Sequence, residues 1–258
     1  MKSNTLNNKL MSTKALVTIS LLTSISIILA RVMGIMIPVA GFPALKINFS
    51  TIPIMLSGIL FGPVAGFMTG GVADVIGYLI NPQGGPFFPG FTLSTALTGM
   101  IPGLVYKVIT KYDKVKKINF NYINGLFIIL TTLGLGYAFY AKGVLAFSHG
   151  VSFNGQPIHI VISGLIILAI GAYIILPFYI TKAIYKKDNI YSFDKLYFTV
   201  SITQIITSLI LNTYFLSILF GKGVLVFLPT RIVTNYIMIP VFTMIFAVLF
   251  KTLKLDEY

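Results

Sequence analysis

Apolar runs long enough to cross a lipid bilayer recur along the whole chain, and this feature constrains the fold more than any other. A helix needs about 20 mostly apolar residues to cross the roughly 30 Å hydrocarbon core. Such runs, of which the second is short, occupy residues 14–36, 50–61, 63–80, 88–109, 119–141, 157–181, 196–220 and 229–250. We therefore predict an all-α integral membrane protein with about eight transmembrane helices, which form a single transmembrane domain over residues 1–258.

The composition excludes a water-soluble globule and several classes of active site. Of the 258 residues, 56% are hydrophobic and 10% are charged, whereas a soluble domain carries roughly a quarter of its residues as charges. The chain has no cysteine, and therefore no thiolate ligand or nucleophile. It also lacks the glycine-rich phosphate loop of ATPases. We expect no cofactor in this chain, so that any ATP would be used by a partner subunit.

The basic residues indicate the orientation of the chain in the membrane. If the first helix begins in the cytoplasm, 14 of the 19 Lys and Arg residues lie inside and five lie outside, as expected for cytoplasmic loops. This predicts a cell-membrane protein with both termini cytoplasmic, and we infer no nucleic-acid binding from the net charge. Both arginines, Arg31 and Arg231, fall on the outer side, where the orientation rule does not explain them.

Four glycines mark a tight pair of helices early in the chain. They occupy every fourth position at 58, 62, 66 and 70, a spacing that lets helix backbones approach closely in lipid. Gly62 is followed by Pro63, which suits the first position of a helix. We predict a helical hairpin with Pro63 opening its second helix.

Asp74 is the only acidic residue within an apolar span. An ionised carboxylate at that depth costs at least about 2.5 kcal/mol, so it is expected to serve a function. Tyr78 lies one turn further out on the same helix face. The alternative is a salt bridge to Arg31 that only joins two helices.

Three further polar residues lie at a similar level near the outer surface. Arg31 closes the first apolar span, Arg231 is expected to open the last, and Asn212 lies about as deep as Asp74. Each alone has a structural explanation: the arginines could reach the headgroups, and Asn212 could bond between helices. Their coincidence at one depth predicts a ligand site.

The outer loop at 81–90 presents Phe87 and Phe88 among prolines and glycines. These rings could belong to the aromatic belt of the membrane interface or stack on a flat ligand. His149 and His159 lie near another outer loop without a third ligand, so we expect no metal site.

One carboxylate, two arginines, an amide and exposed rings suit a flat heteroaromatic group with a donor edge, joined to carboxylates. A carboxylate accepts two parallel hydrogen bonds from such an edge, and guanidinium groups bind carboxylates in a bidentate manner. Pterin-glutamates have this form, although other anions fit nearly as well.

Several separated segments form a recognisable set. They are 29–31, 45–49, 52–53, 58–63, Asp74 with 77–78, 87–94, 211–213, 221–222 and 228–231. Together they resemble the folate-specific substrate-binding (S) component of bacterial energy-coupling factor (ECF) transporters, with the loop from Phe87 to Ser94 as the most specific piece.

The resemblance implies a six-helix bundle that binds a vitamin from outside and associates with a transmembrane coupling subunit and two cytosolic ATPases. It implies that Arg31, Asp74 and Arg231 contact folate, and it adds Lys46 to the expected substrate-binding residues. It also implies that small residues spaced by four on the first helix meet the coupling subunit. This chain has Ser20 and Ser24 there, where the family usually has alanines.

One segment departs from the resemblance. Residues 119–181, here called the inserted hairpin, add two spans to a core formed by 14–110 and 195–250. An even number of added spans preserves the topology of the rest. The expected function is folate binding and translocation without covalent chemistry. The alternatives are an S component for another water-soluble vitamin, a stand-alone secondary transporter, and an intramembrane enzyme with Asp74 as a base.

Overall fold

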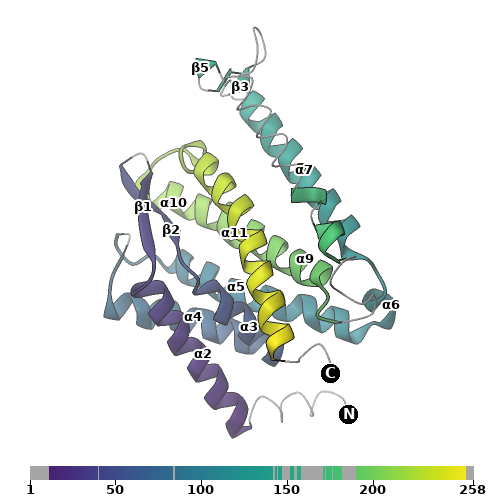
Figure 1. Ribbon diagram of the computed structural model, residues 1–258. Helices are drawn as coiled ribbons and strands as arrows, with labels where there is room; N and C mark the ends of the chain where they lie inside the picture. The colour runs from purple at the N-terminus through teal and green to yellow at the C-terminus, as the bar shows by residue number, and fades with distance from the viewer. Residues whose placement is uncertain are drawn as a thin grey trace.

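The computed structural model describes residues 12–39, 41–83, 85–141, 143, 145–146, 152–153, 156–157, 171, 173–175, 177–181 and 190–253. Within them, six helical segments are long and apolar enough to cross a membrane, and they correspond to six of the eight predicted spans. They are α2 (Thr13–Arg31), α4 (Pro63–Ile80), α5 (Pro89–Lys111), α7 (Phe120–Ala141), Phe193–Phe220 and α11 (Val224–Thr252) (Figure 1).

Two of the eight predicted spans differ from this set. The helix α3 (Thr51–Phe61) has 11 residues, and at 1.5 Å per residue it is too short to cross the bilayer alone. The predicted span 157–181 is helical at 171, 173–175 and 177–181, but its first residue belongs to β5 (Gln156–Pro157). The rest of that span lies outside the described residues.

The first apolar run is only partly helical. The helix α2 ends at Arg31, and an antiparallel hairpin of β1 (Ile35–Val39) and β2 (Phe42–Ile47) follows. Pro38 and Pro43 disfavour a helix here, and the β-branched residues around Pro38 favour a strand. A second small sheet, made of β3 (Leu145–Ala146), β4 (Ser152–Phe153) and β5, lies beyond the end of α7 (Figure 1). The helical fold thus carries strands that an all-α prediction omits.

The predicted glycine packing is confirmed in the contact between α3, α4 and α5. A Cβ atom on Gly58 would lie 2.0 Å from the carbonyl oxygen of Gly99, and one on Gly66 would lie 2.2 Å from the same oxygen. Gly62 forms the turn with a φ of 97°, and Pro63 opens α4. The three backbones can approach this closely only because no side chains intervene.

The segment Phe193–Phe220 is not a uniform α-helix. It consists of α9 (Phe193–Gln204), a π-helical stretch η1 (Ile205–Asn212) and α10 (Thr213–Phe220). The apolar pattern of 196–220 predicts a helix, but it does not predict the π-helical stretch within it.

The last helix begins earlier than predicted. The helix α11 starts at Val224 and contains Pro229, so the prediction that Arg231 opens it is wrong. Pro229 lacks a backbone N–H and so removes one hydrogen bond near the start of α11. The helix nevertheless continues through this position. Arg231 therefore lies in the second turn of α11.

The start of α2 and the end of α11 lie at the same end of the bundle (Figure 1). The β1–β2 hairpin and the turn between α10 and α11 lie at the opposite end, beyond which α7 projects. The main apolar core joins α3, α9 and α11, and it includes Ile128 and Tyr173 of the inserted hairpin. The hairpin therefore packs into the bundle.

Candidate ligand-binding site

The eight residues predicted to bind substrate line one cavity of about 250 Å³. It lies between α2, β2, α4, α5, η1 and α11, at the end of the bundle that carries the β1–β2 hairpin. The eight residues are Arg31, Lys46, Asp74, Tyr78, Phe87, Phe88, Asn212 and Arg231. The three cationic side chains outnumber the one acidic side chain in this lining, so the wall carries a net charge of +2 when all four are ionised.

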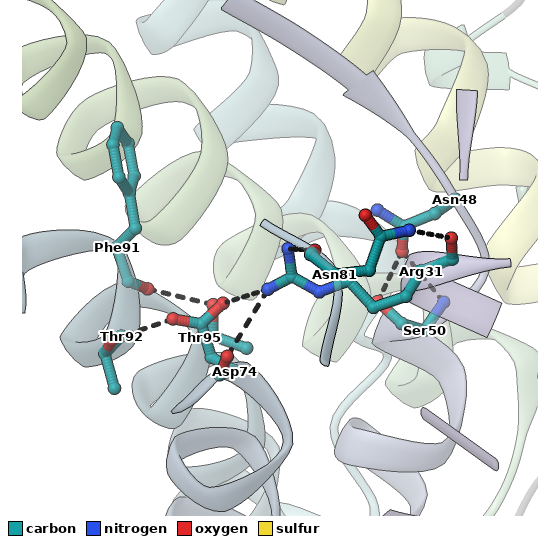
Figure 2. Close-up of polar contacts among 8 residues, drawn as sticks. All are labelled: Arg31, Asn48, Ser50, Asp74, Asn81, Phe91, Thr92 and Thr95. Carbon is teal, nitrogen blue, oxygen red and sulfur yellow. Dashed lines mark hydrogen bonds and ion pairs between the residues drawn. The ribbon is translucent and has the colours of Figure 1, made fainter. Parts of the chain in front are cut away.

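Arg31 forms one pole of the cavity and is held by a carboxylate. Its Nη2 lies 3.4 Å from Oδ1 of Asp74 and donates to the Asp74 carbonyl oxygen at 3.3 Å (Figure 2). Its Nη1 donates to the carbonyl oxygen of Asn81 at 3.2 Å. Arg31 is only 8% exposed, so it does not extend to the headgroups. The alternative salt bridge between Arg31 and Asp74 is present.

Asp74 is more than a partner for Arg31. Its Oδ2 accepts a hydrogen bond of 2.7 Å from Thr92 on α5 (Figure 2), and its side chain retains 21% exposure. Gly77, one turn away on α4, leaves room for the guanidinium, because a Cβ there would lie 2.8 Å from Arg31 Nε. The carboxylate is thus oriented from two helices and still faces the cavity.

The loop after α4 closes over the end of α2. Asn81 Nδ2 and Gln83 Nε2 donate to the carbonyl oxygen of Arg31 at 3.3 and 3.0 Å. Carbonyl groups in the last turn of a helix lack partners within the helix, and these two amides supply them. The Arg31 pole is therefore fixed by both its side chain and its backbone.

Lys46 enters the cavity from β2 of the β1–β2 hairpin. Burial and, to a smaller extent, the charge of nearby Arg31 lower the pKa of its ammonium group to about 8, and Asp74 opposes the shift. A lysine with such a pKa changes charge just above neutral pH.

Arg231 forms the other pole, against the π-helical stretch. Its Nη1 donates to the carbonyl oxygen and to Oγ of Ser208, both at 3.4 Å. Asn235 donates from Nδ2 to Ser208 Oγ at 3.2 Å and to the Arg231 carbonyl oxygen at 2.7 Å. The preceding carbonyl, of Thr207, accepts from Ser94 on α5 at 3.0 Å. Two consecutive carbonyls of η1 are thus used by side chains of neighbouring helices.

Asn212 is the last residue of η1. Its buried Oδ1 has no hydrogen-bond partner within the described part of the chain, and the same is true of Gln83 Oε1. Among the described residues, the Asn212 oxygen therefore forms no interhelical bond. Buried polar atoms without partners are rare in folded proteins, so acceptors in a cavity wall are suited to donor groups of a ligand.

Aromatic rings border the mouth of the cavity. Tyr78 and Phe87 lie with centroids 5.2 Å apart, and Phe87 is 45% exposed. Phe88 instead packs inward on Phe91 and Phe215, at 5.5 and 5.7 Å. Of the two loop phenylalanines, Phe87 is the one available to cover a flat ligand.

Sequence reasoning missed several polar residues of the wall. Gln204 and Ser208 lie eight and four residues before Asn212, and all three line the cavity. This spacing within an apolar span was a usable signal. Thr92, which bonds Asp74 but does not itself line the cavity, gave none, because a threonine at a helix start is unremarkable in sequence.

Ser20 and Ser24 lie elsewhere, on the exposed surface of α2. The Ser24 hydroxyl donates to the Ser20 carbonyl oxygen at 3.0 Å, and their assignment to a partner interface remains a prediction. His149 and His159 lie outside the described residues. Among the described residues, no group of three or more His, Cys, Asp or Glu could hold a metal ion.

A sequence model of a known family matches residues 10–186, and the family is described as the ECF-type riboflavin transporter, S component. Two characterised relatives match shorter stretches. The folate transporter FolT of Clostridium novyi (strain NT) is 41% identical over 64 residues, which is 25% of this chain and 37% of FolT. The riboflavin transporter FmnP of Bacillus subtilis (strain 168) is 37% identical over 72 residues, which is 28% of this chain and 36% of FmnP.

The fold also resembles a solved structure, described as a crystal structure of FolT bound with folic acid. The TM-score is 0.52 at 19% identity, and the similarity covers 90% of this chain and 91% of the other. At that identity the likeness concerns the fold. The matched stretches span little more than a third of FolT and FmnP.

Proposed function

The chain belongs to the family of ECF-type riboflavin transporter S components, and from this membership we propose that it binds folate at the outer side of the membrane. In this role it is the substrate-binding subunit of an ATP-driven vitamin importer. The observation that carries the proposal is the charge of the cavity wall, where Arg31, Lys46 and Arg231 face a single carboxylate.

This charge favours folate over riboflavin. The glutamate part of folate carries two carboxylates, which would compensate the net +2 of the wall. Riboflavin has no carboxylate, and bound riboflavin would leave the surplus charge buried without a partner, which is costly. The likeness to FolT over 64 residues supports the same choice.

The residues take different roles in the proposed complex. Asp74, oriented by Arg31 and Thr92, accepts from the donor edge of the pterin. Arg231 and Lys46 bind the glutamate carboxylates, because guanidinium and ammonium groups form strong charge-assisted bonds with them. Phe87 and Tyr78 cover the pterin face.

Riboflavin is the second candidate ligand, favoured by the description of the family model and by the match to FmnP. Equilibrium binding of folate and riboflavin to the purified protein separates the two. We expect folate binding below about 10 μM that weakens in Asp74→Asn and Arg231→Ala. Riboflavin binding that neither variant affects would favour the second candidate, and no binding of either would refute both.

We further propose that the protein associates with a transmembrane coupling subunit and two cytosolic ATPases, with both termini cytoplasmic. Ser20 and Ser24 lie one turn apart on the exposed surface of α2, a small-residue spacing that suits close helix contact. Replacing both with leucine should prevent co-purification of the coupling subunit and leave folate binding intact. Thr18→Leu, an exposed position on another side of α2, is the matched control.

A further inference from the structure

The inserted hairpin packs against the back of the Arg231 pole. Phe139 of α7 is 8% exposed and clusters with Ile205 and Leu209 of η1 and Leu228 of α11. Leu209 is adjacent to Ser208, which accepts from Arg231. The hairpin therefore covers the outer surface of the π-helical stretch whose inner surface lines the cavity.

The second helical part of the hairpin packs beside it. Tyr173 is 8% exposed and its ring lies 4.8 Å from the ring of Tyr236 on α11. Its carbonyl oxygen accepts a hydrogen bond of 3.1 Å from Tyr197 on α9. These contacts tie the hairpin to α9, which continues into η1, and to α11, whose Asn235 donates to Ser208 of η1.

One polar contact joins the hairpin to α11 at the level of the site. Thr132 of α7 and Tyr236 share a hydrogen bond between their hydroxyl groups. Tyr236 follows Asn235, which is 5% exposed and lines the ligand cavity. Asn235 also lines a small apolar cavity of about 20 Å³ beside Tyr173 and Tyr236, so this residue separates the hairpin from the ligand site.

Asn235 in turn holds the residues of the Arg231 pole. It donates to the hydroxyl of Ser208 and to the carbonyl oxygen of Arg231. A rotation of α11 at Tyr236 would move Asn235 and Arg231 together and break their bonds to Ser208 on η1, because adjacent residues on a helix turn together. The orientation of Ser208 and Arg231 thus depends on the position of Tyr236.

We propose that the inserted hairpin is part of the ligand site, with Thr132 and Tyr236 as positioning residues that hold Asn235, Ser208 and Arg231 in place. The hairpin takes no part in contacting the ligand. It fixes the π-helical wall from outside, which a bundle of the core helices alone would leave facing lipid. The effect on affinity rests on the proposed function, whereas the effect on the wall does not.

The test uses three single substitutions in the full-length protein. Thr132→Val and Tyr236→Phe each remove one hydroxyl of the shared bond and keep the shape. Thr131→Val is the matched control, because among the described residues the Thr131 hydroxyl bonds to carbonyls of its own helix alone, at 2.9 Å. Hydrogen exchange of the ligand-free protein reports on the wall, and folate titration reports on the site.

We expect backbone amides of 205–213 to exchange roughly 3- to 10-fold faster in Thr132→Val and Tyr236→Phe, as for the loss of one hydrogen bond. Amides of α4 and α5 should be unchanged, as should the whole Thr131→Val protein. Folate affinity should fall about threefold in either variant and no further in the double variant, because both remove the same bond. In an Arg231→Gln background, Tyr236→Phe should have no additional effect.

Unchanged exchange at 205–213, or an equal change in Thr131→Val, would overturn the proposal. A loss of folate affinity that persists in the Arg231→Gln background would also overturn it, because the effect would then not act through Arg231. If the unaltered protein binds no folate, the proposed function fails, and the exchange measurement alone decides the positioning role.

Discussion

The two arginines of the cavity occupy opposite poles and are held in different ways. Arg31 is tied to the Asp74 carboxylate, to backbone carbonyls and to the loop after α4. Arg231 donates to the neutral oxygens of Ser208 on the π-helical stretch. Much of the charge of Arg31 is thus compensated within the protein, where the pair joins α2 to α4. The comparison separates an arginine that a carboxylate of the protein holds from one that, under the proposed function, meets an anionic ligand.

The largest effect on affinity is expected from Arg231→Gln. Charge-assisted hydrogen bonds contribute about 1.5–3 kcal/mol each, so losing a guanidinium–carboxylate contact should weaken folate binding roughly 100-fold. The melting temperature should change little. Lys222→Gln is the control, since Lys222 is an exposed cation near Phe42 that does not line the cavity. Equal losses in both variants would mean that general attraction, and not the pole, binds the anion.

Asp74→Asn tests the other pole and should affect both stability and affinity. Removing one partner of a buried ion pair leaves the other charge uncompensated, although the 21% exposure of Asp74 reduces the cost. We expect folate affinity to fall roughly 10- to 30-fold, as for the loss of one charged hydrogen bond, together with a lower melting temperature. Thermal melting in detergent and folate titration measure the two effects.

Combining Asp74→Asn with Arg31→Gln tests directly whether the ion pair joins the two helices. Arg31→Gln should also lower the melting temperature, and Arg31→Gln combined with Asp74→Asn should lower it by less than the sum of the single changes. Strict additivity would show that the pair does not join the helices. A melting temperature that falls equally in Arg231→Gln would remove the difference between the poles.

How much of this site the sequence could predict depended on the kind of signal at each residue. Asp74, Arg31 and Arg231 stand out because charges are expensive in lipid, and all three line the cavity. Ile35–Val39 is as apolar as the helix before it, so hydropathy could not mark the start of β1. The π-helical stretch differs from an α-helix in the hydrogen-bond register of its backbone. The side-chain pattern of 205–212 carries little information about that register.

Other residues needed tertiary structure to be recognised. Pro229 is a helix-start signal by position, but α11 tolerates it in its second turn. Gln204 and Ser208 carried a spacing signal that could have been read. Asn235 was visible one turn from Arg231, but its contact with Ser208 depends on how η1 packs against α11, and no local pattern encodes that contact.

Lys46 lies near Arg31 and Asp74, and its titration makes the binding of an anion depend on pH. Its pKa in the ligand-free protein is about 8, and an anion bound beside it would raise that pKa. Binding therefore takes up a proton, and folate affinity should fall as pH rises from 7 to 9, by up to roughly tenfold. In Lys46→Met this loss should be absent, and any titration of the ligand itself is common to both proteins. Parallel pH profiles would show that Lys46 does not face the anion.

The smallest effect is expected at Asn212, which belongs to the Arg231 pole. Its Oδ1 is buried without a partner among the described residues, so Asn212→Leu removes an unsatisfied acceptor rather than a bond. The ligand-free protein should melt at the same temperature or slightly higher, because leaving such a group buried costs about 1–3 kcal/mol. Folate affinity should nevertheless fall a few-fold if a donor of the ligand normally meets this oxygen. A lower melting temperature with unchanged affinity would instead make Asn212 a structural residue, and the π-helical wall would then contribute to binding through Arg231 alone.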